Sequence, residues 1–182
     1  MKIYGLVVMG GLMVWGAAAE AQLGVYGKVD YRHFGDSSIS TSNGFYGGTV
    51  GVYDDFVHLG PVRAGLDLRG GLAKSSKVDY REALVGVRVA VKAPVVPFKP
   101  YVQASLGAEE SKYTGPTAVG ITTSYHGNLI WQVFGGVDFT VLPHIDWRAV
   151  EVGVGKQSTA SGFNYTAGPT VVTVGTGLVF RL

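Results

Sequence analysis

The 182-residue chain contains no cysteine, so disulfide bonds cannot contribute to its stability. Charged residues are scarce, at 15%, and the formal net charge of +2 is too small to favour nucleic acid as a partner. After residue 21 there is no run of about 18 apolar residues, which argues against a membrane-spanning helix there. The mean hydropathy is nevertheless high, at +0.24. High hydropathy without long apolar runs is typical of strands in which apolar and polar residues alternate.

The N-terminus has the pattern of a cleavable signal peptide. Lys2 supplies a positive charge, an uncharged apolar stretch follows, and Ala19 and Ala21 match the small residues that precede a cleavage site. We expect residues 1–21 to be removed near Ala21, leaving a single mature domain of residues 22–182 that is exported. The other interpretation is an N-terminal anchor that is never cleaved.

The mature part alternates between apolar and polar residues with a period of two. In the first such segment, Val25 and Val29 share one face, and Lys28 and Asp30 share the other, because successive residues of a strand point to opposite sides. Asp54 breaks the alternation of the second segment, which indicates a β-bulge there. The pattern predicts eight strands, at residues 22–34, 45–57, 61–72, 80–92, 98–110, 128–141, 145–156 and 168–182.

The connections between these segments also alternate in kind. Three are short and contain proline, and they cover residues 58–61, 92–97 and 142–144. Four are polar and mostly longer, and they cover residues 35–44, 73–79, 111–127 and 157–167. Short periplasmic turns and longer outer loops are the expected asymmetry of an outer-membrane barrel.

The C-terminal segment strengthens this interpretation, because Leu178, Phe180 and Leu182 alternate with Gly177, Val179 and Arg181. Together with the signal peptide, the eight segments and the loop lengths, this ending resembles the small bacterial outer-membrane β-barrel superfamily. That group includes the OmpA transmembrane domain, OmpX-like proteins and opacity-type proteins. Its usual last residue is Phe, whereas this chain has Leu182.

The resemblance implies an all-β fold, an eight-stranded antiparallel transmembrane β-barrel in the outer membrane of a Gram-negative cell envelope. It also implies contact with outer-membrane lipids and lipopolysaccharide. Gly177, Phe180 and Leu182 would form the C-terminal insertion signal, through which the barrel-insertion machinery acts on the last strand. We expect a monomer.

The inward faces of the eight segments carry six positive and six negative residues. They are Lys28, Arg32, Arg63, Arg69, Arg88 and Arg181, with Asp30, Asp67, Glu82, Glu109, Asp138 and Glu151. An eight-stranded barrel has an interior that side chains fill, and an unpaired charge there is costly. We therefore expect a plug of ion pairs in the lumen, formed by Lys28, Asp30, Arg32, Asp67, Arg69, Glu82, Arg88, Glu109 and Glu151.

Two details of this interior are specific enough to test. Gly175 and Gly177 on the last strand leave room between its neighbours, so Glu151 should pair with Lys28, Arg69 or Arg88. On the seventh strand the alternation predicts that Trp147 faces inward. Arg148 is expected to face outward and to reach the lipid headgroups. Aromatic residues near strand ends are expected to form interface girdles, namely Phe34, Phe45, Phe56, Phe98, Phe139, Trp147 and Phe180.

Three functions fit such a barrel. The first is a structural or surface-interaction role, and the second is a narrow pore for small solutes. The third is a lipid-modifying hydrolase, in which Ser124, His126 and Glu109 or Glu110 would supply the nucleophile, base and carboxylate. No recognisable catalytic motif surrounds these residues, so we do not expect an enzyme. The four histidines are scattered, and no metal or cofactor is expected.

Overall fold

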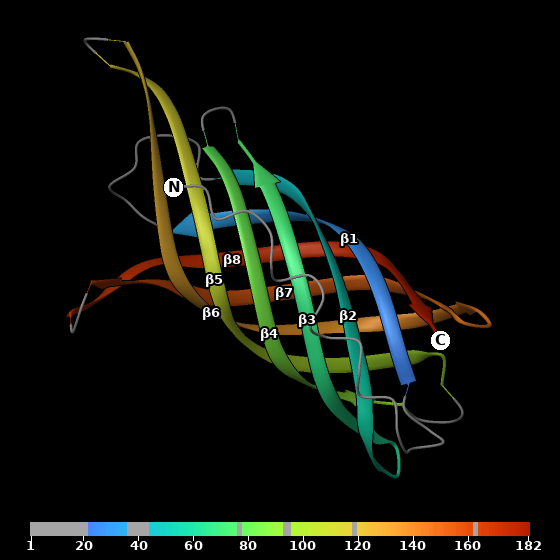
Figure 1. Cartoon of the computed structure of the whole chain (residues 1–182). Coiled ribbons are helices and arrows are strands. Elements are labelled where there is room, and N and C mark those ends of the chain that lie inside the picture. Colours follow the sequence, from blue (N-terminus) through green and yellow to red (C-terminus); the bar gives the residue numbers. More distant parts are fainter. Residues whose placement is uncertain (1–21, 36–43, 76–77, 93–95, 118–119, 162–163) are drawn as a thin grey trace.

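The computed structural model describes residues 22–35, 44–75, 78–92, 96–117, 120–161 and 164–182 (Figure 1). It contains eight strands: β1 (Gln22–Gly35), β2 (Gly44–Leu59), β3 (Val62–Lys74), β4 (Val78–Val91), β5 (Phe98–Thr117), β6 (Gly120–Leu142), β7 (Ile145–Ser161) and β8 (Asn164–Arg181). Consecutive strands pair antiparallel, and β8 pairs with β1 to close the barrel. The predicted fold class of an eight-stranded antiparallel barrel is confirmed. The proposed signal peptide and its cleavage site lie outside the described residues.

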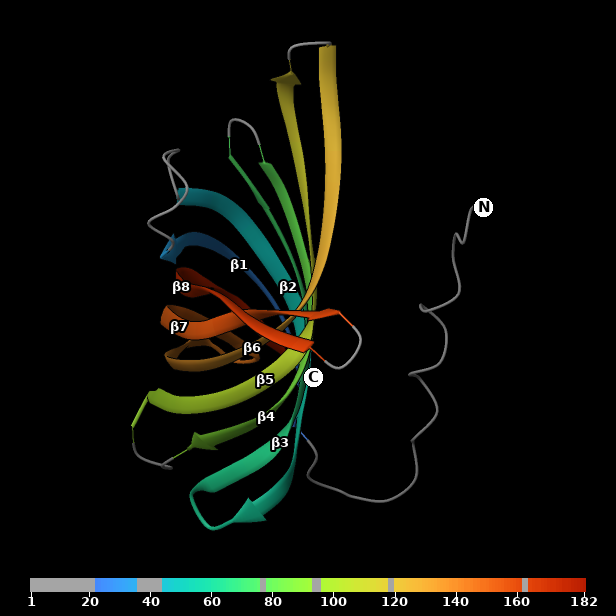
Figure 2. The ribbon, with the colours of Figure 1, turned by 90° about the vertical axis from the view of Figure 1, so that its left-hand side faces the viewer.

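The barrel has two distinct ends. The turn end carries the β2–β3, β4–β5 and β6–β7 connections together with the start of β1 and the end of β8. Gly60 has a φ of 63° in the β2–β3 turn, a left-handed conformation that glycine adopts readily. The hairpin end carries the other connections. Figure 2 shows the β5–β6 hairpin standing out from the barrel at this end.

The alternation of side chains follows the predicted phase along most strands. On β4 every second residue from Glu82 to Ala90 is buried, and the residues between them are exposed. The outward residues are apolar, and among them are Val25, Val29, Val50, Leu66, Leu68, Val85, Val87, Val89, Val102, Leu106, Trp131, Val133, Val152, Val154, Val174, Leu178 and Phe180. The charged core therefore lies inside the barrel, and the apolar surface lies outside.

Two β-bulges, near Asp54 on β2 and near Arg148 on β7, bear on the predicted faces, and the register also shifts between Thr140 and Leu142 and between Lys156 and Ser158. On β2 the register with β3 shifts between Asp54 and Val57, which confirms the bulge predicted near Asp54. On β7 the register shifts between Arg148 and Glu151, because one extra residue of β7 lies opposite β8. The extra residue reverses the faces before it, so the prediction for this part of β7 was wrong. Trp147 faces outward, and Arg148 is fully buried in the lumen.

The longer loops are shorter than the sequence predicts. Most of the predicted loop 111–127 is strand, because β5 and β6 stay paired up to Thr117 and Gly120. The segment 157–167 is also largely strand, with β7 and β8 paired up to Ser161 and Asn164. Polar, Ser- and Thr-rich sequence is as compatible with a solvated two-stranded ribbon as with a loop, and the sequence did not distinguish the two. Within the described residues, no helix has the length and apolar character needed to cross a membrane.

Candidate functional site in the barrel lumen

Large polar side chains fill the lumen of the barrel. The guanidinium groups of Arg32, Arg69, Arg88 and Arg148 are all essentially inaccessible to solvent, although arginine is rarely buried. A buried charge is tolerated when it is paired and hydrogen-bonded. The partners of these four arginines therefore define the site.

Glu151 on β7 lies at the centre of the network. Its Oε1 is 3.2 Å from Nζ of Lys28 and 2.9 Å from Nη1 of Arg69. Its Oε2 is 3.2 Å from Nη1 of Arg148 and accepts a 2.5 Å hydrogen bond from the hydroxyl of Tyr101. Two of the three cations expected beside Glu151 contact it. The third, Arg88, has other partners.

A second part of the network ties Arg69 to β3 and β5. Nε of Arg69 is 2.9 Å from Oδ1 of Asp67, and Nη2 donates to the side-chain oxygen of Gln103 at 2.8 Å. The amide nitrogen of Gln103 donates to Asp67 at 2.8 Å, and the hydroxyl of Tyr26 donates to the same carboxylate at 2.9 Å. The neutral side chains of Gln103 and Tyr26 therefore add hydrogen bonds to Asp67 beyond its contact with Arg69.

Asp138 on β6 bridges two arginines on the turn side of Glu151. Its Oδ2 is 3.0 Å from Nη2 of Arg88, and its Oδ1 is 2.9 Å from Nε of Arg148. Asp55 is a weaker partner of Arg88, with 4.0 Å between Oδ1 and Nε. Arg148 thus joins Asp138 to Glu151 and makes the network continuous across the lumen.

Arg32 is the centre of a group closer to the hairpin end. It pairs with Asp30, with 2.9 Å between Nε and Oδ1, and with Glu82, with 2.9 Å between Nη1 and Oε1. Asp30 also lies 3.1 Å from Nζ of Lys28 and accepts a 2.6 Å hydrogen bond from the hydroxyl of Thr49. Lys28 therefore links this group to Glu151.

Glu109 differs from the other expected members of the plug. Its two carboxylate oxygens accept hydrogen bonds from the amides of Asn128 at 2.9 Å and Gln157 at 2.6 Å. Within the described part of the chain, these neutral donors take the place of the expected cation. Equal numbers of inward charges therefore do not produce one-to-one pairs.

Aromatic rings stack against the buried guanidinium groups. Arg88 lies between Tyr53 and Tyr101, at 4.2 Å and 3.8 Å from the ring centroids. Arg148 contacts the rings of Tyr26 and Tyr101 at 4.3 Å and 4.7 Å. Desolvated cation–π contacts of this kind contribute about 2 kcal/mol or more each. The rings also occupy volume that water would otherwise fill.

An apolar cluster lies inside the barrel beside the charges, and its members Tyr80 and Phe134 contact Arg32 and Arg69. Its buried members are Phe34, Phe45, Ala73, Tyr80, Leu84, Ile130, Phe134 and Val171. The rings of Phe34 and Phe45 meet edge to face, with centroids 5.0 Å apart. The prediction that these two residues join an interface girdle was wrong, because both face inward.

Sequence reasoning missed part of this site for two different reasons. The period of two puts Tyr26, Tyr53 and Tyr101 on inward faces, but it does not reveal their contacts with arginine. The phase of β1 would also have placed Phe34 inside, two residues after Arg32. Arg148 could not be found in this way, because the bulge that turns it inward leaves no clear mark in the sequence.

The remaining candidate residues lie on the last strand and on β6. Phe180 and Leu182 are exposed on the outward face, and Gly177 packs on the inward side against Lys28. The backbones of Ser124 and His126 belong to β6. Their side chains lie outside the described part of the structure, so the hydrolase geometry stays an expectation.

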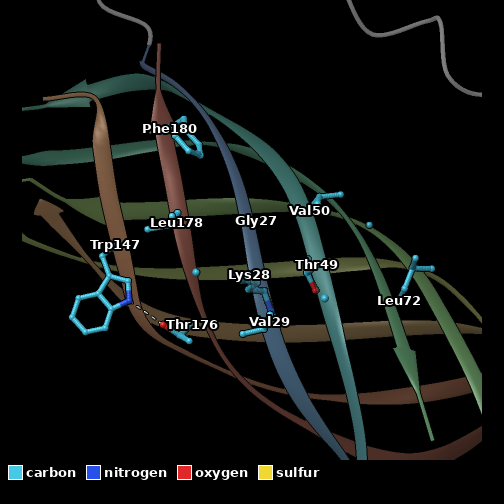
Figure 3. Close-up of a pocket in the computed structure, with 13 residues that line it drawn as sticks. Gly27, Lys28, Val29, Thr49, Val50, Leu72, Trp147, Thr176, Leu178 and Phe180 are labelled. Atoms are coloured by element: carbon cyan, nitrogen blue, oxygen red, sulfur yellow. Dashed lines mark hydrogen bonds between the residues drawn. The ribbon is translucent and has the colours of Figure 1, made fainter. Parts of the chain in front are cut away.

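The outward face carries a shallow apolar hollow of about 790 Å³ across β8, β1, β2 and β3 (Figure 3). Its floor includes Gly27, where an added Cβ would meet no atom within 4 Å. Trp147 and Leu178 are among its lining residues, and the indole nitrogen of Trp147 donates to the hydroxyl of Thr176 at 3.1 Å. The polar atom of this exposed ring is thus satisfied, and the surface that it presents is apolar.

Comparisons with models of known protein families and with curated protein sequences found no match. Solved structures with a similar fold include a major outer membrane protein from Thermus thermophilus, with a TM-score of 0.59 and 13% identity over 90% of this chain and 100% of that one. Neisserial surface protein A gives 0.53 and 15% over 88% and 97%. The attachment invasion locus protein Ail of Yersinia pestis gives 0.51 and 10% over 90% and 99%. The chain thus has the fold of the small outer-membrane β-barrels.

Proposed function

We propose that this protein is an outer-membrane β-barrel with a structural or surface-interaction role, and that a plug of ion pairs and aromatic rings keeps its lumen closed. The observation that carries the proposal is the inverted distribution of polarity. Charged residues such as Glu151 are buried in the barrel, while residues such as Val87 are exposed around it. A water-soluble barrel would have the opposite distribution.

This surface supports a membrane location. In hydrocarbon every backbone polar group needs an internal partner, and a closed barrel provides one for each strand. The continuous ladder from β1 to β8 meets this requirement. Phe180 and Leu182 give the last strand the apolar outward face on which, in our proposal, the insertion machinery acts.

The short contacts between buried arginines and carboxylates favour a closed lumen over a conduit. Each of the four buried arginines contacts at least one carboxylate within 3.0 Å. Opening a water path would require several of these contacts and the aromatic stacks to separate together. The apolar cluster around Phe34 and Phe45 adds a second barrier that water does not stabilise.

The proposed surface role rests on the hairpin end. The β5–β6 ribbon extends beyond the barrel, and the short turns and both ends of the barrel chain lie at the other end. In the membrane, the hairpin end would face the environment and the turn end the periplasm. Two proteins with this fold carry surface or attachment roles in their names, the Neisserial surface protein and the Yersinia attachment protein.

The absence of cysteine makes this topology directly testable with single introduced thiols. Lys74→Cys places a thiol at the hairpin end, where the lysine side chain is 79% exposed. Val96→Cys places one at the turn end, where Val96 is also exposed. In intact cells, a membrane-impermeant maleimide should label only the first variant, and both should react after the outer membrane is permeabilised. Labelling of Val96→Cys in intact cells, or recovery of the protein outside the outer-membrane fraction, would contradict the proposal.

A further inference from the structure

The turn end of the barrel contains a cationic cavity that belongs neither to the plug nor to the apolar surface. It has a volume of about 570 Å³, and its lining includes Arg63, Lys92, Lys99 and Arg181. These residues come from β3, the segment after β4, β5 and β8. The closed barrel therefore brings together positive charges from three separate regions of the sequence, at residues 63, 92–99 and 181.

One carboxylate serves two of these cations. Oδ2 of Asp146 lies 2.7 Å from Nζ of Lys99 and 3.0 Å from Nε of Arg181. Asp55 interacts electrostatically with Arg63, but this carboxylate is shared with Arg88. Nε of Arg63 is buried and has no hydrogen-bond partner among the described residues. Asp138 also acts on Lys99, and it is shared with Arg88 and Arg148. Each of these carboxylates near Arg63, Lys99 and Arg181 is therefore shared between cations.

Lys92, the fourth cation of the cavity, lies outside the strands. Burial lowers the pKa of its ammonium group, and the positive charges of Lys99, Arg181 and Arg63 lower it further. Asp146 acts in the opposite direction and raises this pKa. An anion placed among these four groups would relieve the repulsion and supply hydrogen-bond acceptors for the two guanidinium groups.

We propose that this cavity binds a phosphate-bearing anion at the turn end of the barrel. Arginine presents a planar fork of donors that matches phosphate oxygens, and lysine adds a mobile point charge. The anion could come from two sources of the same chemistry, a free phosphate compound or the headgroup of an anionic phospholipid.

Binding is tested with inorganic pyrophosphate as the probe. The refolded protein, in a phosphate-free non-ionic detergent, is titrated calorimetrically at constant ionic strength, with sodium chloride making up the difference. Saturable binding with one site per barrel is expected. Arg63→Gln and Lys92→Gln should each weaken it at least tenfold, whereas Lys74→Gln at the hairpin end should leave it unchanged.

The proposal is overturned by three results. These are heat that is not saturable, binding that chloride reproduces, or equal affinity in the Lys74→Gln, Arg63→Gln and Lys92→Gln variants. A strand-dominated circular dichroism spectrum shows that each variant is folded. Residue Lys92 lies outside the strands, so the Lys92→Gln variant still tests the proposal if Arg63→Gln does not fold.

The source of the anion is resolved by repeating the titration in bilayers. If a lipid headgroup occupies the cavity, pyrophosphate should bind more weakly in phosphatidylcholine bilayers that contain phosphatidylglycerol than in pure phosphatidylcholine. Equal affinity in both would assign the site to a free phosphate compound. The detergent experiment does not depend on where the protein lies in the cell or on whether it conducts, so it can fail independently of the proposed function.

Discussion

Lys28 on β1 and Glu151 on β7 form an ion pair of 3.2 Å, although β8 lies between their strands. The contact is possible because β8 has glycine where it crosses them. Gly177 pairs with Lys28, and Gly175 pairs with Glu151. A Cβ added at Gly177 would overlap the Cβ of Lys28 and the backbone oxygen of Gly27. The centre of the plug therefore depends on the absence of side chains at these two positions.

Gly177→Ala should destabilise the barrel. The added methyl group forces Lys28 or the backbone of β1 to move, and overpacking of this kind costs about 1–3 kcal/mol. Gly135→Ala is the matched control, because a Cβ at Gly135 meets no atom within 4 Å. The free energies of unfolding are compared by guanidinium titration of the refolded proteins, monitored by tryptophan fluorescence. Equal stabilities would show that β8 does not need glycine here.

Glu151→Gln removes the shared negative charge and leaves Lys28, Arg69 and Arg148 without it. Removing one partner of a buried ion pair costs about 3–5 kcal/mol, because the remaining charges stay buried and uncompensated. The same titration should give a loss in this range. Glu110→Gln, at an exposed position of β5, should change stability by less than about 1 kcal/mol. A loss below about 1 kcal/mol for Glu151→Gln would mean that water reaches the site.

Arg148→Lys keeps the charge but should still destabilise the protein. Lysine cannot bridge Asp138 and Glu151 with a rigid fork, and it cannot stack as a plane on Tyr26 and Tyr101. The expected loss is about 1.5–3 kcal/mol, the range for a hydrogen bond to a charged group. Arg81→Lys, at an exposed position of β4, is the control and should be neutral. If both variants are neutral, Arg148 acts only as a point charge.

The outward face is tested with Val87→Arg. Val87 is 56% exposed in the middle of β4, between Leu66 and Ala104 on the adjacent strands. Arginine at the bilayer midplane should cost about 2–4 kcal/mol, whereas near the interface the cost falls to about 0–1 kcal/mol. Val141→Arg, next to the β6–β7 turn, is the interfacial control. Unfolding measured in phospholipid bilayers should separate the two variants, and equal losses would mean that β4 does not cross at this depth.

Much of this architecture could be predicted because a strand has one simple rule. Once Lys28 and Val29 are assigned to opposite faces, the period of two fixes the faces of the rest of β1. In a barrel the strands also follow one another in sequence order, which identifies the neighbours of each strand. The pairing of Glu151 with Lys28 followed from that order and from the two glycines of β8. No similar rule locates an extra residue, so the bulge in β7 put Arg148 on the wrong face.

The ends of the strands were also beyond sequence reasoning. The alternation of apolar and polar residues stops near Glu110, so the ribbon beyond it carries no signal that separates it from a loop. The partner of an inward charge is equally hard to predict, because it depends on side-chain reach across the lumen. Glu109 therefore binds two amides, although its inward position alone suggested a cation.

The most direct test of a closed, plugged barrel is the conductance of the refolded protein in a planar lipid bilayer, with a heat-denatured sample as the control for detergent. In our proposal, the ion pairs of Glu151 and Asp138, the stacked arginines and the apolar cluster together block a continuous water path through the lumen. We expect no steady conductance above that of the control. Reproducible single-channel steps from the folded protein alone would contradict the plug and favour a narrow pore.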